Sequence, residues 1–412
     1  MRDFLPADKA RRERVLSVIR ESYRAHGFDE IETPVMEESA RLHAGLGGDN
    51  EKLAFGVLKR DLTPDDFAAA QSGLDLADLG LRFDLTVPLT RFYASHHSEL
   101  PSVFRAIQIA PVWRAERPQK GRYRQFVQCD IDIIGEAGTL AEVELITATS
   151  ATLGALGIEG CAIRINDRRL LASMLSVFGF PVGEHAAVLI TIDKLDKLGE
   201  SGVIAELRAR AFPDEPVAAL EAFYQRETPA KSFDEAGIRA ALPAGIDDTA
   251  VHELAALAEA FDPTTRALLE FDPFLVRGMG YYTGTIFEIA HPEFGYALGG
   301  GGRYDGMIGR LLGRDVAAVG FSLGFERLVD LVTLRDDNEV DAVALVYGDD
   351  VSHGQLVALK SALIAQGKRV RLERKPRNLK PLLAQLAASG FSSVATVSES
   401  STAESLEFRP LA

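Results

Sequence analysis

Apolar residues near the N-terminus recur at helical spacing. Residues 7–26 place Val15, Ile19 and Tyr23 at intervals of four, which predicts an amphipathic helix. The segment that follows, FDEIETPVME, alternates like a strand but contains Pro34, which has no amide hydrogen to donate to a neighbouring strand. We therefore expect this strand at a sheet edge or at an interface.

Alternation at period 2 predicts further strands in the first half of the chain. Residues 81–94 alternate before they take on a helical pattern, and a basic turn joins two strands at about 103–116 and 122–135. Residues 140–157, rich in Ala, Leu and Thr, predict a helix after this hairpin.

The middle of the chain, about 166–270, has a different character. It is helical in pattern, broken by prolines, and carries no recognisable chemical motif, so we interpret it as an inserted helical region. A strand-rich block returns from about 273 and is expected to end in a helix at 321–333. From about 339 strands and helices alternate, which predicts a small α/β domain. Its expected helices are 354–366 and 378–388.

Composition narrows the class of protein. The 412 residues suffice for two or three domains, and 47% hydrophobic with 25% charged residues is typical of globular proteins. A net charge of −15 excludes a surface that binds nucleic acid everywhere by charge, although local basic patches can still do so. With only Cys129 and Cys161, neither a disulfide framework nor a four-cysteine metal site can be built. The chain starts without an apolar signal core and has no run near the ~20 apolar residues of a membrane span, so we expect a soluble cytoplasmic protein with no membrane contact.

The turn of the predicted hairpin is strongly basic for so acidic a chain. The stretch VWRAERPQKGRYRQFVQ, residues 112–128, holds five basic residues and one acidic residue. A basic run is usually a solvated surface, but arginine side chains also match phosphate oxygens. On this segment alone the two interpretations have about even weight.

The second strand of the hairpin has one apolar face and one polar face. Period 2 places Val127, Cys129, Ile131 and Ile133 on the first and Phe126, Gln128, Asp130 and Asp132 on the second. The polar face is either solvent-exposed or lines a polar ligand pocket, in which the Phe126 ring could stack on a ligand. Cys129, on the apolar face, is expected to be a buried, inert thiol.

A further carboxylate, Asp84, lies in LRFDLTVPL. We expect it to share a strand face with Arg82 and Thr86, opposite Phe83 and Leu85. Alone it would be a helix cap or a solvated residue, whereas beside Asp132 it could bind an ammonium group.

The glycine-rich segment LGGGGRYDG, residues 298–306, indicates close approach of a ligand or of another backbone, because consecutive glycines weaken a strand. It lacks the Lys-Ser/Thr of a phosphate-binding loop and the spacing of a dinucleotide fingerprint. Upstream, Arg277 precedes Tyr281 and Tyr282, and Arg327 starts an apolar helix where it must pair or reach an anion. Chemistry based on arginines, carboxylates and tyrosines suits charge stabilisation and orientation rather than covalent catalysis.

Together these motifs resemble class II histidyl-tRNA synthetases along nearly the whole chain. Three pieces fit the class II set in order: the helix and strand ending at Pro34, the hairpin from about 107 to 133 with its loop RAERPQKGRYRQF, and the element GFSLGFERL. Two others, LRFDLT at 81–86 and RGMGYYTG at 277–284 followed by GGGGRYDG, point to histidine in particular.

The resemblance implies roles for individual residues. Arg114 and Arg277 would be catalytic, acting at the α-phosphate of ATP, and Phe126 would stack on adenine. The ATP contacts would be Arg114, Glu116, Arg122, Phe126 and Arg327. The contacts to L-histidine would be Asp84, Leu85, Thr86, Arg114, Gln128, Asp132, Arg277, Tyr281, Tyr282 and Tyr304.

The resemblance also implies the architecture and the partners. We expect an α+β class II aminoacyl-tRNA synthetase core, an antiparallel sheet flanked by helices, from residues 1–165 and 271–335. A helical insertion at 166–270 and a C-terminal α/β anticodon-binding-like domain at 336–412 would complete it. Such a protein is a cytoplasmic homodimer that uses ATP with Mg²⁺, L-histidine and tRNA(His). The segment GKRVRLERKPRNLK, with seven basic residues and one acidic residue, would suit RNA phosphates.

Two departures keep alternatives open. Gly280 stands where the family commonly has aspartate, and after SSVATV the tail lacks an expected closing helix. One alternative is a synthetase-like, histidine-binding regulatory subunit of ATP phosphoribosyltransferase, although such proteins tend to lose the ATP-handling arginines. The other is a paralogue that activates an amino acid without charging tRNA.

Overall fold

The computed structural model describes residues 1–44, 53–117, 121–226, 231–277, 281–332 and 341–411. It divides into two compact units, Leu16–Thr333 with Met1, and Arg2–Val15 with Leu334–Ala412. This division does not test the domain boundaries expected from the sequence, which remain predictions.

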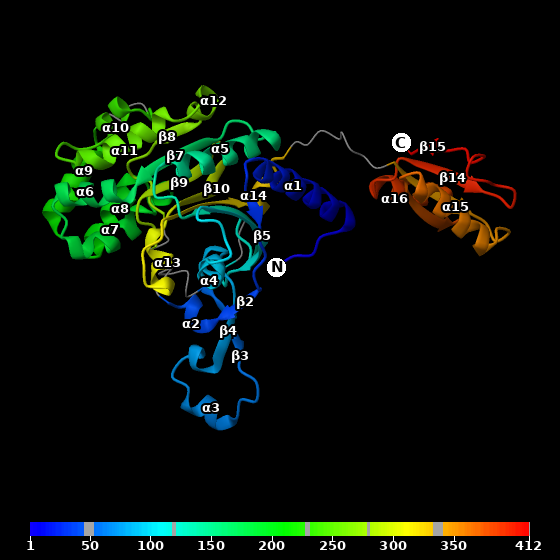
Figure 1. Cartoon of the computed structure of the whole chain (residues 1–412), viewed down its shortest axis with the longest axis horizontal. Helices are drawn as coiled ribbons and strands as arrows, with labels where there is room; N and C mark the ends of the chain where they lie inside the picture. The colour runs from blue at the N-terminus through cyan, green and yellow to red at the C-terminus, as the bar shows by residue number, and fades with distance from the viewer. Residues whose placement is uncertain (45–52, 118–120, 227–230, 278–280, 333–340, 412) are drawn as a thin grey trace. The chain divides into compact units, whose positions relative to one another are not determined.

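The larger unit is built on a sheet with the order β1-β5-β6-β11-β10-β9-β7-β8 (Figure 1). Its strands are β1 (Asp29–Glu30), β5 (Phe104–Trp113), β6 (Gln125–Ile134), β7 (Ala162–Asp167), β8 (Leu269–Phe271), β9 (Thr285–His291), β10 (Phe294–Arg303) and β11 (Ala318–Gly324). The outer pairs β1–β5 and β7–β8 are parallel, and all other neighbours in this sheet are antiparallel. The predicted α+β core with a largely antiparallel sheet is therefore confirmed.

Helices flank this sheet, as expected for the class. Helix α5 (Leu140–Ala155) packs on β6 and β11, while α4 (Thr86–His96) packs against α13 (Asp305–Leu312). A core cluster that includes Phe83, Leu89 and Tyr304 joins α4 and α13 to the sheet. Helix α1 (Pro6–Ala25) matches the predicted amphipathic helix, and Val15, Ile19 and Tyr23 are fully buried.

A second, three-stranded sheet of the larger unit has the order β2-β4-β3. Its strands are β2 (Met36–Glu38), β3 (Phe55–Leu58) and β4 (Ala77–Leu81), with the short helices α2 (Ser39–Leu42) and α3 (Pro64–Ala69) beside them. In Figure 1 the β3–α3–β4 segment extends away from the large sheet.

The middle of the chain is helical between two strands of the large sheet. The helices are α6 (Arg168–Phe178), α7 (His185–Ile192), α8 (Leu195–Ala209), α9 (Asp214–Tyr224), α10 (Glu235–Ala241), α11 (Asp248–Glu259) and α12 (Pro263–Arg266). Both margins of the predicted 166–270 region are strands, because β7 extends to Asp167 and β8 begins at Leu269.

The helix predicted at 321–333 is wrong in its first half. Residues up to Gly324 complete β11, which hydrogen-bonds to β6 on one side and β10 on the other. Only α14 (Phe325–Leu328) is an α-helix among the described residues there, and residues 333–340 lie outside the described part. Strand pairing on both sides outweighs the helical pattern of the short GFSL segment.

The smaller unit has a four-stranded sheet of order β13-β12-β14-β15. Strand β12 (Ala342–Tyr347) is parallel to β13 (Arg369–Arg374) and to β14 (Ser393–Val397), and the helices are α15 (His353–Ala365) and α16 (Leu379–Ala388). The predicted small α/β domain is confirmed. The tail beyond β14 ends as β15 (Arg409–Pro410), antiparallel to β14, rather than as a helix.

Among the described residues, no helix combines the length and the apolar character that crossing a bilayer requires.

Candidate active site

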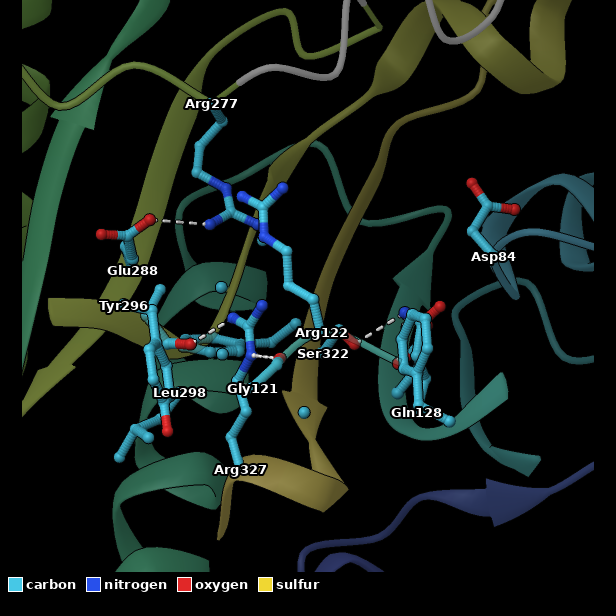
Figure 2. Close-up of a pocket in the computed structure, with 18 of the residues that line it drawn as sticks. Asp84, Gly121, Arg122, Gln128, Arg277, Glu288, Tyr296, Leu298, Ser322 and Arg327 are labelled. Atoms are coloured by element: carbon cyan, nitrogen blue, oxygen red, sulfur yellow. Dashed lines mark hydrogen bonds and ion pairs between the residues drawn. The ribbon is translucent and has the colours of Figure 1, made fainter. Parts of the chain in front are cut away.

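A cavity of about 410 Å³ lies where β6, β11 and β10 are neighbours in the large sheet. The hairpin turn after β5, the segment before β9 and the corner between α7 and α8 also contribute to its walls. In Figure 2, Arg122, Arg277 and Arg327 lie on one side of the cavity, with Glu288 beside Arg277, and Asp84 and Gln128 lie on the other side.

Four arginines line the cavity: Arg114, Arg122, Arg277 and Arg327. Arg122, Arg277 and Arg327 point toward one another in Figure 2. The Arg327 Nε donates to the Gly121 carbonyl oxygen at 3.1 Å, and its Nη1 donates to the Ala297 carbonyl oxygen. The Arg114 Nε donates to the carbonyl oxygen of Phe83 at 2.9 Å. Backbone carbonyls thus hold two of these side chains without neutralising their charge.

The arginines repel one another electrostatically. Burial lowers the pKa of the Arg327 guanidinium, and the positive charges of the other three arginines lower it further. A bound polyanion would relieve this repulsion and accept the N–H donors. Phe126 adds an aromatic wall here, with the Arg114 guanidinium carbon 5.0 Å from its ring centroid.

Three buried aspartates line the same cavity: Asp84, Asp130 and Asp132. Burial raises the pKa of Asp84 to about 6 and that of Asp132 to about 7. Burial also raises the pKa of Asp130 well above its usual range, and the nearby Asp132 charge raises it further. A cationic ligand in the cavity would lower these raised pKa values and so favour the ionised carboxylates.

Asp84 does not lie on a strand face as predicted, but in the link between β4 and α4. Its Oδ1 accepts a hydrogen bond from the Val87 amide at 3.1 Å, in the first turn of α4. Its Oδ2 is buried and has no hydrogen-bond partner among the residues that the structure describes. The residue therefore acts as a helix cap with one oxygen and leaves the other for a ligand.

Gln128 presents a second buried acceptor of this kind. Its Nε2 donates to the Ser322 Oγ at 2.9 Å and lies 3.3 Å from the Asp130 Oδ2. These contacts orient the carboxamide so that Oε1 is left buried and, within the described ranges, without a partner. Two unsatisfied acceptors beside ionisable aspartates suit an ammonium group, which carries three donors.

Three tyrosines form the remaining wall: Tyr281, Tyr282 and Tyr304. The Tyr304 Oη donates to the Asp132 Oδ1 at 2.7 Å. The Tyr281 ring lies edge-on to Tyr282, with centroids 4.8 Å apart, and 6.1 Å from the Tyr304 ring. Gly320 faces Asp132, and a Cβ there would overlap the Asp132 Oδ1.

The glycine run lies in β10, at the centre of the sheet, and serves close approach as predicted. An added Cβ at Gly300 would lie 2.6 Å from the Arg277 Nη1, and one at Gly301 would overlap the Gly320 carbonyl oxygen. Gly300 thus makes room for an arginine side chain, and Gly301 for the neighbouring strand.

Most of the predicted site residues line this one cavity. They are Asp84, Thr86, Arg114, Glu116, Arg122, Phe126, Gln128, Asp132, Arg277, Tyr281, Tyr282, Tyr304 and Arg327. Leu85 is not among the lining residues: it is fully buried, and its carbonyl oxygen accepts from the Gln108 Nε2 at 3.0 Å. The basic Lys120 and the unusual Gly280 lie outside the described residues.

Sequence reasoning missed several lining residues. Asp130 was on the predicted polar face but was not assigned a role, although its position between two assigned residues on that face was a usable signal. Ser322 and Glu288 gave no local signal, because only the strand order brings them to the cavity. The corner between α7 and α8 adds Asp193, Asp196 and Lys197.

The comparisons with known proteins agree with this geometry. A family model described as histidyl-tRNA synthetase matches residues 1–328. A histidine–tRNA ligase of Leifsonia xyli is 59% identical over 420 aligned residues, covering 100% of this chain and 97% of the relative. A solved histidyl-tRNA synthetase of Nostoc matches with a TM-score of 0.73 at 23% identity, covering 96% and 90% of the two chains.

A solved protein of Bacillus halodurans, described as an ATP phosphoribosyltransferase regulatory subunit/histidyl-tRNA synthetase, has a TM-score of 0.76 at 20% identity and covers 97% of each chain. At this identity the similarity concerns the fold.

Proposed function

The chain belongs to the histidyl-tRNA synthetase family, and on this premise we propose that its central cavity joins L-histidine to ATP and then transfers the histidyl group to tRNA(His). The observation that carries the proposal is that four arginines and three buried aspartates line one cavity. This arrangement complements a polyphosphate beside an amino acid that carries an ammonium group.

The first step requires alignment and positive charge rather than an activated nucleophile. The carboxylate of histidine is already ionised at neutral pH, and its oxygen attacks the α-phosphorus of ATP. A new P–O bond forms, and the bond to the leaving pyrophosphate breaks with its electron pair. Arg114 and Arg277 would neutralise the charge on the α-phosphate oxygens, with Arg122 and Arg327 on the rest of the nucleotide and Phe126 stacked on adenine.

The acidic end would select the amino acid. Asp84 and Gln128 each offer a buried acceptor without a partner among the described residues, which suits the α-ammonium group. Asp132, held by Tyr304, would accept a hydrogen bond from the imidazole ring, with Tyr281 and Tyr282 beside it. Thr86 lines the same end.

ATP would be used with Mg²⁺, which proteins typically hold with one or two carboxylates plus substrate phosphates. Among the described residues no cluster of three or more His, Cys, Asp or Glu side chains could hold a metal by itself. Glu116 and Glu326 line the cavity and would supply such carboxylates; Glu116 also pairs with Arg122, and Glu326 accepts a hydrogen bond from the Val127 amide. When bound, the ion would neutralise phosphate charge.

In the second step a terminal hydroxyl of tRNA would attack the carbonyl carbon of histidyl-adenylate, and AMP would leave. The smaller unit would hold the anticodon end through its basic segment 367–380. Arg369 and Arg371 lie over the Phe391 ring, at 4.7 and 4.6 Å from its centroid, so their guanidinium groups are ordered on an aromatic surface. Part of the segment is neutralised, because Lys368 pairs with Asp341 and Arg374 with Asp349.

We further propose a cytoplasmic homodimer, because the resemblance to class II enzymes assigns dimerisation to the first helix and the segment that follows it up to Pro34, of which only Asp29–Glu30 forms a strand, β1. The regulatory-subunit alternative predicts loss of the ATP-handling arginines. All four line the cavity, which favours the ligase.

Histidine-dependent ATP–pyrophosphate exchange, followed by charging of tRNA(His) on the same sample, tests the proposal. Exchange with charging is expected, and Arg277→Ala should nearly abolish both. Arg208→Ala, which removes an arginine from the α8–α9 ion pair with Glu221, is the matched control and should leave both intact. Exchange without charging would favour the tRNA-independent paralogue. Histidine binding without exchange would overturn the ligase proposal.

A further inference from the structure

One glutamate of the large sheet joins two arginines. The Glu288 Oε2 accepts a hydrogen bond from the Arg277 Nη1 at 2.9 Å, and its Oε1 accepts from the Arg164 Nη2 at 2.6 Å. The Glu288 side chain is 14% exposed and that of Arg164 is 15% exposed. Each carboxylate oxygen is therefore committed to a different guanidinium group in a largely desolvated place.

Strand register fixes this arrangement. Glu288 of β9 is paired with Arg164 of β7 on one side and with Gly300 of β10 on the other. Because Gly300 has no side chain, the Arg277 guanidinium lies directly over it, and an added Cβ would be 2.6 Å from Nη1. Arg277 thus lies over Gly300, with Glu288 at its side, and Figure 2 shows the pair of charged side chains.

Arg164 is itself firmly held. Its Nη1 donates to the Asp272 Oδ2 at 3.3 Å, and its Nη2 donates to the Asp196 Oδ2 at 3.2 Å. Glu288 cannot turn toward Arg277 or away from it without losing the shorter bond to Arg164. The carboxylate is consequently anchored on one side and directs a guanidinium on the other.

The bond to Glu288 is the one hydrogen bond or ion pair of the Arg277 side chain within the described residues. The other N–H donors of the Arg277 guanidinium are therefore available to a ligand in the cavity. Asp193, Tyr281 and Tyr282 also interact electrostatically with Arg277, but Glu288 is the partner that accepts a directional hydrogen bond from it.

We propose that Glu288 is a positioning residue that orients Arg277 toward the reacting phosphate, with Arg164 as its anchor. The inference rests on the proposed function of the cavity. Glu288 does not touch the substrates in this scheme, and acts on the reaction only through the Arg277 guanidinium.

The direct test is Glu288→Gln in histidine-dependent ATP–pyrophosphate exchange. A carboxamide has one acceptor oxygen, so it can satisfy one arginine and must turn an NH₂ group toward the other. Because a displacement of about 1 Å can cost about 100-fold in rate, we expect kcat to fall about 10- to 100-fold. The KM values for histidine and ATP should stay within about threefold, since the other contacts are unchanged.

A double-mutant cycle separates positioning from a general structural role. In an Arg277→Ala background, Glu288→Gln should cause no further loss of kcat, because the group that it orients is gone. Losses that multiply would overturn the proposal, as would an unchanged kcat in Glu288→Gln alone. Absence of exchange in the unmodified protein would instead contradict the proposed function, so the two failures are distinguishable.

Glu144→Gln is the matched control. It breaks an equally close Arg–Glu pair in the same unit, with Arg105 Nε and Glu144 Oε2 2.6 Å apart, and neither residue lines the cavity. Its kcat should stay unchanged. If Glu288→Gln unfolds at the assay temperature, Glu288→Asp provides a second measurement, because its shorter side chain cannot span both arginines. A lower kcat with unchanged KM values would support the proposal, and a full kcat would overturn it.

Discussion

Replacing Asp132 by Asn should stabilise the ligand-free protein, and by more at pH 8 than at pH 5. Burial raises the pKa of this carboxyl from 3.8 to about 7. In the unfolded chain the group ionises near its ordinary pKa. Between the two values the folded state holds a proton that the unfolded state releases, so stability is lost as pH rises toward 7.

The size of the effect follows from the shift. A rise of about 3 units, at about 1.4 kcal/mol per unit, costs the folded state up to about 4 kcal/mol at pH 8. At pH 5 the same arithmetic leaves less than half of this cost. Asn has almost the same shape and keeps an acceptor for the Tyr304 hydroxyl, whose bond to Asp132 is 2.7 Å long. The Asn variant should therefore gain at least about 2 kcal/mol more at pH 8 than at pH 5.

Urea unfolding measured by tryptophan fluorescence is a suitable assay, because Trp113 is the single tryptophan and lies in β5 of the large sheet. Asp262→Asn is the control. Hydrogen bonds from Thr265 lower the pKa of Asp262, so its carboxylate is ionised in both states at pH 5 and at pH 8. Its effect should be the same at both pH values. An equal effect of Asp132→Asn at pH 5 and pH 8 would refute the argument, because it would mean that the buried carboxyl holds no extra proton. The same variant should raise the KM for histidine.

Three other substitutions test separate parts of the large unit. Gly301→Ala should destabilise by about 3 kcal/mol in urea unfolding, because its methyl group would overlap the Gly320 carbonyl and separate two central strands. Glu142→Gln should cost about 2 kcal/mol in the same assay, since it removes the buried carboxylate 2.6 Å from Arg303 and leaves that arginine with the longer 3.3 Å pair to Asp305; a loss below 1 kcal/mol would show that the pair is dispensable. Arg327→Ala should raise the KM for ATP about tenfold with little change in the KM for histidine, as measured by steady-state exchange kinetics. A raised KM for histidine with an unchanged KM for ATP would contradict this assignment.

Local periodicity predicted the parts of the site that lie on one continuous strand. In β6 the alternation from Phe126 to Asp132 placed the polar residues on one face, and that face lines the cavity. Both faces of this strand are largely buried. The alternation therefore distinguished a face that lines the cavity from a face that packs in the core, and not a solvent-exposed face from a core face. This is why Gln128 and Asp132 could be identified without knowledge of the neighbouring strands.

Residues that depend on contacts distant in sequence could not be predicted in this way. Asp84 lies in a segment that alternates like a strand, yet its carboxylate caps the first turn of α4 by accepting a hydrogen bond from the Val87 amide. Glu288 reads as an ordinary polar position of β9, and its importance appears only when β9 is placed between β7 and β10. The resemblance to a known family named Arg277 but gave no reason for its orientation, which depends on that strand order.

The strand order also explains how one cavity holds both signs of charge. A single cross-strand row runs through paired positions of five strands: Asp130, Ser322, Gly300, Glu288 and Arg164. Burying polar groups in such a row costs free energy unless each has a hydrogen-bond partner. Here the residues of the row form hydrogen bonds with site residues on both sides of the cavity. Ser322 and Asp130 orient the Gln128 carboxamide at the acidic end, Glu288 and Arg164 orient Arg277 at the basic end, and Gly300 leaves the space between them. The distance between the two ends is thus set by the width of the sheet, which a rigid antiparallel core holds more reproducibly than loops would.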